Sequence, residues 1–386
     1  MHKEIDDLLR VATESTMTAV SAVVCDSGGQ RYEGAFGSRA PNGSPMTVDT
    51  VGAIMSMTKA VTGVAAMQCV ERGQLSLDAP AGEICPYLGV AKVFTGYDDN
   101  GEPILRDSHQ PITLRNLLTH SSGFVYEIWN SEAIKVQEKL GLPSIMTLQK
   151  KSLEVPLMFD PGERWEYGIG IDWVGQMIET VSGTTLGEYF QEHITEPLGM
   201  QDTGFAPSEA MLAKMMAMLV RDQEGALVAP PEAAPGPAPE FEMGGGGLLS
   251  SATDYSRFLT MLLRGGELDG ARILEAETVD LMAQNHLGDL RVTKLPSSDL
   301  TRSQDAEFFP GDEKSWGLTF QINEEAGFTG RPKGTLMWAG LSNCCYWIDR
   351  QNDLAGVFVS QVLPFADPAC LDTFYQFEKL VYEHTR

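Results

Sequence analysis

The chain has 386 residues, 43% of them hydrophobic, so it is long enough to bury a large core. Its 53 acidic and 28 basic residues give a net charge of −25, which argues against a nucleic-acid partner because a polyanion would be repelled. The sequence shows no run of membrane-spanning length and no secretory hydrophobic segment near its start. We therefore expect a soluble, cytoplasmic protein without a membrane partner.

The first predicted elements are a helix and a β-hairpin. Residues 1–10 are polar and charged around three aliphatic positions, a pattern typical of an amphipathic helix. The apolar segments 17–25 and 30–36 flank the turn residues at 27–29, which indicates two antiparallel strands. We expect this hairpin to join strands from the other end of the chain in one sheet.

A serine and a lysine three residues apart open the next predicted helix. After Ser56 and Lys59 an apolar helical pattern continues until Gly73. Positions i and i+3 share a helix face, and the positive end of the helix dipole favours negative charge on the serine oxygen. A lysine buried beside the serine would lose its proton readily and act as its base. The alternative is a serine that caps the helix beside a solvated lysine.

A tyrosine lies on a glycine-rich loop just before another predicted helix. Tyr167 belongs to the segment 161–170, and the apolar pattern of a helix follows until Gly183. Such a loop can project the phenol into a cleft, although a packed surface tyrosine fits the same pattern. Tyr126 and Trp129 are candidates to line this cleft, with ordinary packing as the equal alternative.

Three strands are predicted near the C-terminus, over 333–341, 344–349 and 354–359. The first contains Trp338 and Gly340, and a glycine in a strand allows close backbone approach by a ligand.

The cysteines and histidines do not indicate a metal site. Six cysteines form no C-x-x-C pair and are expected to be free thiols, and the histidines lack zinc-ligand spacing. His120 is expected to be a hydrogen-bonded structural residue. We therefore predict neither a metal nor a cofactor.

Together these motifs resemble a known enzyme family. The order of S-x-x-K at Ser56 and Lys59, a loop tyrosine at Tyr167 and a strand with W-x-G at Trp338 and Gly340 is similar to the family VIII carboxylesterases. Those enzymes are similar to class C β-lactamases and DD-peptidases. Further segments that carry the resemblance are 117–124, 196–200 and 244–251.

The resemblance implies a role for each matching residue. Ser56 would be the acylated nucleophile, Lys59 its base partner and Tyr167 the second member of the proton-transfer pair. The backbone N–H groups of Ser56 and Leu341 would form an oxyanion hole, which stabilises negative charge as it develops. Which of Lys59 and Tyr167 takes the first proton stays open, because coupled groups share their titration.

The resemblance also implies an α+β fold. An α/β domain with a central antiparallel sheet flanked by helices would comprise residues 1–75 and 291–386. A mostly helical inserted domain would comprise residues 76–290, with the site in the cleft between the two. The oligomeric state stays open, a homo-oligomer included.

Two departures from the β-lactamase pattern indicate the substrate class. The residue two positions after Tyr167 is Ile169 rather than asparagine, and Trp338 stands where those enzymes have the lysine of K-T-G. Lysine offers a charge for a substrate carboxylate, whereas tryptophan offers an apolar wall, to which Tyr126, Trp129 and Gly340 would add. We therefore expect hydrolysis of neutral small-molecule esters with short to medium acyl chains, with β-lactam turnover as a side activity.

Three alternatives to an esterase remain. The first is a β-lactamase or D-amino-acid peptidase, and the second is an acyltransferase, in which an alcohol or amine replaces water. The third is a non-catalytic sensor or scaffold that binds an acyl ligand.

Overall fold

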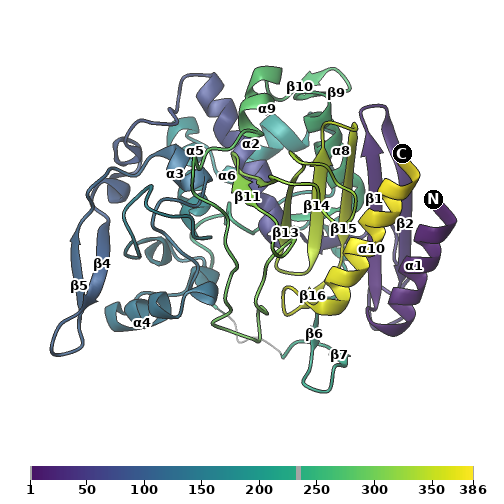
Figure 1. The fold of residues 1–386 in the computed structure, drawn as a ribbon, viewed down its shortest axis with the longest axis horizontal. Helices are drawn as coiled ribbons and strands as arrows, with labels where there is room; N and C mark the ends of the chain where they lie inside the picture. The colour runs from purple at the N-terminus through teal and green to yellow at the C-terminus, as the bar shows by residue number, and fades with distance from the viewer. Residues whose placement is uncertain (1, 232–235, 386) are drawn as a thin grey trace.

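A seven-stranded antiparallel sheet lies at the centre of the protein, in the order β11-β12-β13-β14-β15-β1-β2 (Figure 1). The computed structural model describes residues 2–231 and 236–385. The hairpin of β1 (Ala19–Asp26) and β2 (Gly29–Gly37) pairs with β15 (Leu354–Val359), so both ends of the chain build one sheet. The predicted hairpin and the α+β class are therefore confirmed. The remaining strands of this sheet are β11 (Lys314–Trp316), β12 (Gln321–Asn323), β13 (Leu336–Gly340) and β14 (Cys344–Asp349).

Helices cover both faces of the sheet. Neighbouring residues of a strand point to opposite faces, and on β14 the ring of Trp347 contacts α10 (Pro368–Thr385) while Tyr346 contacts α8 (Ala252–Leu263). In Figure 1, α10 lies in front of the strands beside α1 (His2–Ser15), and the two chain ends are neighbours. Every residue of β1, β13, β14 and β15 is buried as a result.

The middle of the chain forms helices, short strands and loops. The central helix is α2 (Thr58–Glu71), which is buried from Thr58 to Cys69 and packs against α5 (Gly170–Ser182). The predicted limits of an inserted domain at residues 76 and 290 stay a prediction. Within the described residues, no helix is both long and apolar enough to cross a bilayer. The other helices are α3 (Leu114–Leu118), α4 (Ser131–Leu140), α6 (Leu186–Phe190), α7 (Glu209–Ala213) and α9 (Ala276–Met282). The other strands are β3 (Val51–Ala53), β4 (Lys92–Tyr97), β5 (Pro103–Asp107), β6 (Leu219–Arg221), β7 (Leu227–Val228), β8 (Leu249–Ser251), β9 (Glu267–Leu268), β10 (Ala271–Arg272) and β16 (Val362–Leu363).

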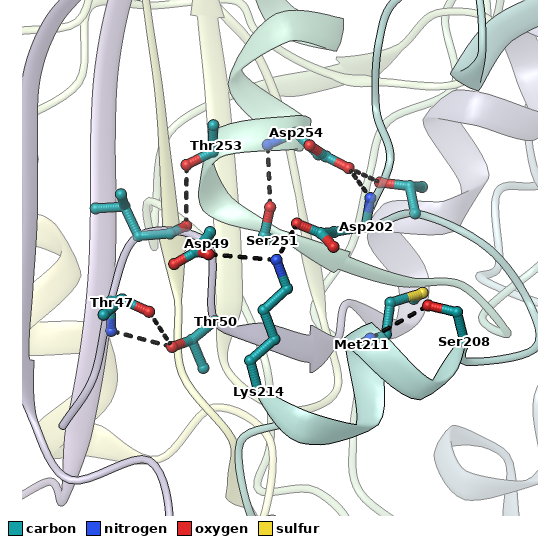
Figure 2. Close-up of polar contacts among 12 residues, drawn as sticks. Thr47, Asp49, Thr50, Asp202, Ser208, Met211, Lys214, Ser251, Thr253 and Asp254 are labelled. Atoms are coloured by element: carbon teal, nitrogen blue, oxygen red, sulfur yellow. Dashed lines mark hydrogen bonds and ion pairs between the residues drawn. The ribbon is translucent and has the colours of Figure 1, made fainter. Parts of the chain in front are cut away.

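A polar cluster lies beside the short strand β3, which precedes α2 and pairs with β8. Figure 2 shows Lys214 between two carboxylates, with its Nζ 3.2 Å from Asp49 and 2.6 Å from Asp202. The carboxylate of Asp254 accepts the N–H of Asp202 at 2.7 Å. Burial raises the pKa of Asp254 to about 6, and its hydrogen bonds oppose that rise. The cluster anchors β3, and thereby the turn that leads into α2.

Candidate active site

Ser56 lies in a short 3-10 turn, η1 (Met55–Met57), directly before α2. The α-helix begins two residues after the serine, in agreement with the prediction of a helix that opens near Ser56. Met55, directly before the serine, has a φ of +49°, a left-handed conformation that an α-helix cannot include. Strain of this kind is concentrated at functional sites. The turn leaves Ser56 partly exposed at the head of a buried helix.

Lys59 is buried directly beneath the serine. Its Nζ lies 3.0 Å from Ser56 Oγ, 3.0 Å from the hydroxyl of Tyr126 and 2.6 Å from the carbonyl oxygen of Gly245. The alternative of a solvated lysine is wrong, because Lys59 is only 1% exposed. Burial lowers the pKa of Lys59 to about 7, and the charge of Asp172 acts in the opposite direction.

The amino group of Lys59 donates all three hydrogen bonds, to Ser56, Tyr126 and Gly245, and the same positions also suit the neutral amine that burial favours. Such an amine has two N–H donors and one lone pair. It can donate to Tyr126 and Gly245 while it accepts the hydroxyl proton of Ser56. The arrangement can therefore activate the serine for nucleophilic attack without a metal ion. Among the described residues, no group of three or more potential ligands is placed to hold a metal.

Tyr167 is buried next to the same pair. Its hydroxyl accepts the indole N–H of Trp338 at 2.9 Å, and its ring lies 4.7 Å from Lys59 Nζ. Burial raises the pKa of Tyr167, while hydrogen bonds with Ser56 and Trp338 oppose the rise. The alternative of a surface tyrosine is wrong, since this residue is only 2% exposed. The structure thus brings Ser56, Lys59 and Tyr167 together.

Aromatic rings surround the phenol of Tyr167. The ring centroids of Tyr126, Trp129 and Trp338 lie 5.1, 5.3 and 4.9 Å from that of Tyr167. His120 packs 4.6 Å away and accepts the N–H of Gly168, as expected of a structural histidine. Burial, with a smaller effect from Lys59, holds the pKa of His120 well below its usual value, so it stays neutral.

The backbone of Ile54 lies close to Gly340, the position at which the sequence predicts close approach by a ligand. Gly340 ends β13 against η1, and a Cβ at this position would lie 2.2 Å from the carbonyl oxygen of Ile54. The next residue, Leu341, is partly exposed, as is Ser56. Within the described part of the chain, the N–H groups of Leu341 and Ser56 make no hydrogen bond, so both are available as donors. The oxyanion hole at these two groups stays a prediction.

Two features of the site were missed from the sequence. The sequence predicts Tyr126 to line the pocket or to pack in the core, whereas its hydroxyl accepts a hydrogen bond from Lys59. Asp172, in the first turn of α5, is fully buried and accepts the N–H of Gly245 at 2.7 Å. An acidic residue within the apolar stretch that opens this helix, five positions after Tyr167, was the available signal for it.

A family model described as Beta-lactamase matches residues 5–380. The chain belongs to this family. It is 34% identical over 385 residues to a lovastatin esterase of Penicillium rubens, covering 94% of each chain. It is 31% identical over 379 residues to a monacolin J acid methylbutanoyltransferase of Aspergillus terreus, covering 92% of this chain and 89% of the relative.

Solved structures agree with the family. Unliganded simvastatin synthase from Aspergillus terreus has a TM-score of 0.80 at 30% identity, over 99% of this chain and 98% of that one. EstCE1, a hydrolase with promiscuous acyltransferase activity, has a TM-score of 0.78 at 22% identity and supports the fold alone. The resemblance to the serine β-lactamase superfamily is thereby confirmed, and its relatives include both hydrolases and acyltransferases. Membership of family VIII stays a prediction.

Proposed function

We propose that this β-lactamase-family protein cleaves neutral carboxylic esters of short to medium acyl chains through an acyl-enzyme on Ser56. The observation that carries the proposal is the buried amine of Lys59, 3.0 Å from Ser56 Oγ, with a pKa lowered to about 7 by burial. Such an amine is neutral in a large fraction of molecules at physiological pH and can accept the serine proton. Relatives named as an esterase and as acyltransferases support the same chemistry.

In the proposed first half-reaction, Lys59 accepts the hydroxyl proton as Ser56 Oγ attacks the ester carbonyl carbon. The carbonyl electron pair moves to oxygen, where the N–H groups of Ser56 and Leu341 stabilise it. When the pair returns, the bond to the alcohol oxygen breaks, and Tyr167 gives that oxygen a proton. The Lys59 ammonium then restores the phenol. Water repeats these steps in the second half and releases the carboxylic acid.

The aromatic surroundings support a neutral substrate. The ring centroid of Trp338 lies 4.9 Å from that of Tyr167 and 5.9 Å from that of Phe308, and its side chain offers no charge for a carboxylate. This favours an ester over a penicillin or a peptide that ends in a carboxylate.

Hydrolysis of p-nitrophenyl butyrate by the wild type and by Ser56→Ala tests the proposal. We expect the variant to lose activity while its circular dichroism and melting temperature stay near those of the wild type. Mass spectrometry of the acid-quenched wild type should show one butyryl group on the peptide that contains Ser56. Near-normal activity of the folded variant would remove Ser56 from its role.

Acyl transfer is the second candidate, favoured by the named acyltransferases among the relatives. Adding 1-butanol to the ester assay separates the two functions. A hydrolase releases butyric acid in proportion to p-nitrophenol, whereas a transferase diverts most of the acyl group to butyl butyrate. A higher kcat/KM for nitrocefin than for the ester would instead favour a β-lactamase. A long-lived adduct without turnover would favour a sensor.

A further inference from the structure

Asp172 and Lys59 both form hydrogen bonds with the backbone of Gly245. Gly245 donates its N–H to Asp172 Oδ1 at 2.7 Å, and its carbonyl oxygen accepts from Lys59 Nζ at 2.6 Å. Asp172 comes from the first turn of α5, Lys59 from α2, and Gly245 from the glycine-rich loop before β8. One residue of backbone therefore links the carboxylate to the amine.

The space around Gly245 admits no side chain. A Cβ there would lie 2.7 Å from the hydroxyl of Tyr126, and 2.8 and 2.9 Å from the two carboxylate oxygens of Asp172. The hydroxyl of Tyr126 and the carboxylate of Asp172 thus both lie close to the space where a side chain at Gly245 would be. The second oxygen of Asp172, Oδ2, is buried without a hydrogen-bond partner. A carboxylate buried in this way is costly unless it has a compensating charge, and Lys59 supplies one while it is protonated.

The titratable groups that face this carboxylate come from three elements besides its own. They are Lys59 of α2, Tyr126 before η4 (Glu127–Trp129) and Tyr167 of the loop before α5. The charge of Asp172 raises the pKa of all three groups. For the two phenols, burial is the larger effect and also raises the pKa. For Lys59, burial is the larger effect and lowers the pKa. Burial raises the pKa of Asp172 itself to about 6, and Lys59 opposes this rise.

We propose that Asp172 is a positioning residue for Lys59. Its carboxylate holds the Gly245 N–H so that the carbonyl of this residue points at the amine, and its negative charge sets the fraction of Lys59 that carries a proton. This inference rests on the proposed function, in which Lys59 exchanges a proton with Ser56. A purely structural role, such as compensation of the α5 dipole, would change stability alone.

The test uses Asp172→Asn, which removes the charge but keeps an oxygen that can accept the Gly245 N–H. The acidic limb of the kcat/KM profile reports the protonation of the essential base in the free enzyme. Because the carboxylate raises the pKa of Lys59, its loss should move this limb to lower pH, by about one unit or more. The limb should lie near pH 7 in the wild type.

A second measurement does not depend on activity. In protein labelled with [13C]lysine, the Cε signal of Lys59, assigned by its absence in Lys59→Arg, reports the protonation of this one amine. We expect the midpoint to fall in Asp172→Asn. An unchanged midpoint in this titration would overturn the inference, even if Ser56→Ala proved active and the proposed function failed. If Asp172→Asn does not fold, Asp172→Ser supplies a smaller neutral acceptor for the same titration.

Asp254→Asn is the matched control. Asp254 is also a largely buried acid in the first turn of a helix, and burial raises its pKa to about 6 as well. Its partners are Asp202, which Figure 2 shows, and Thr203, rather than Lys59. This variant should leave the acidic limb and the Lys59 midpoint where they are in the wild type. An equal shift in both variants would show a general effect of net charge and would overturn the specific role of Asp172.

Discussion

Replacing Gly340 by alanine should displace the turn that carries the nucleophile. The added Cβ would lie 2.2 Å from the carbonyl oxygen of Ile54 and 3.0 Å from its carbonyl carbon, whereas ordinary contacts measure 3.4–4 Å. Both atoms belong to the backbone directly before η1, so no side-chain rotation relieves the clash. The strand and the turn must therefore separate by about 1 Å, and Ser56 moves with the turn.

The size of the effect follows from this displacement. Overpacking of a tight contact typically costs about 1–3 kcal/mol in the free energy of unfolding. A misplacement of reacting groups by about 1 Å can cost about a hundredfold in rate. We therefore expect Gly340→Ala to fold with a lowered melting temperature and to lose about a hundredfold in kcat/KM for p-nitrophenyl butyrate. The loss in rate should exceed anything that the unfolded fraction explains.

Gly204→Ala provides the comparison for this variant. A Cβ at Gly204 would meet only the carbonyl oxygen of Ala206, at 3.8 Å, so this substitution should leave both stability and kcat/KM near the wild type. The two proteins should be assayed well below their melting temperatures, with the folded fraction verified by circular dichroism. A folded Gly340→Ala protein with the kcat/KM of Gly204→Ala would refute the coupling between β13 and Ser56.

Three further predictions concern single side chains. Tyr167→Phe removes only a hydroxyl, so it should lose most of the turnover of p-nitrophenyl butyrate at an unchanged melting temperature; normal kcat would reduce this tyrosine to packing. Trp338→Phe removes the N–H that lowers the pKa of Tyr167, so stopped-flow measurement should show slower acylation, and an unaltered rate would contradict this role. The pKa of Asp254 is raised to about 6 in the folded protein, from about 4 in the unfolded chain. Protonation of this side chain therefore stabilises the fold fully below about pH 4, and the stabilisation is lost as the pH rises through about 6. Urea unfolding should therefore show that the wild type loses stability relative to Asp254→Asn between these pH values, and parallel curves would disprove it.

The sheet could be predicted from the sequence because its signals are local. The apolar segments on either side of Ser27 and Gly29 specify a hairpin by pattern alone, and β14 and β15 follow from apolar runs separated by turn residues. Pairing the N-terminal hairpin with the C-terminal strands was then the simplest way to bury the apolar residues of both. The left-handed φ of Met55 before the serine could not be predicted, because glycine usually supplies that conformation and methionine does not indicate it.

The contacts of Lys59 with distant parts of the chain could not be predicted from local sequence patterns. Spacing placed the amine near Ser56, but its other contacts come from Tyr126 and Gly245, which are 67 and 186 residues away in the chain. Asp172 acts through Gly245, a contact that spans 73 residues. Hydrophobic periodicity gives information on a single helix or strand. It therefore predicted that Lys59 lies beside Ser56, but not which residues of other elements influence the pKa of Lys59.

The two phenols at the site differ in their partners, and this difference separates their roles. The hydroxyl of Tyr126 accepts an N–H of Lys59, and every effect on its pKa, burial first, raises it. The pKa of Tyr167 is also raised by burial, but hydrogen bonds with Ser56 and Trp338 act against it. At Tyr167 hydrogen bonds oppose the effect of burial on the pKa, whereas at Tyr126 every effect raises the pKa, so Tyr167 can release and regain a proton more readily than Tyr126. We infer that Tyr126 holds the amine in place, and that the phenol proton moves at Tyr167.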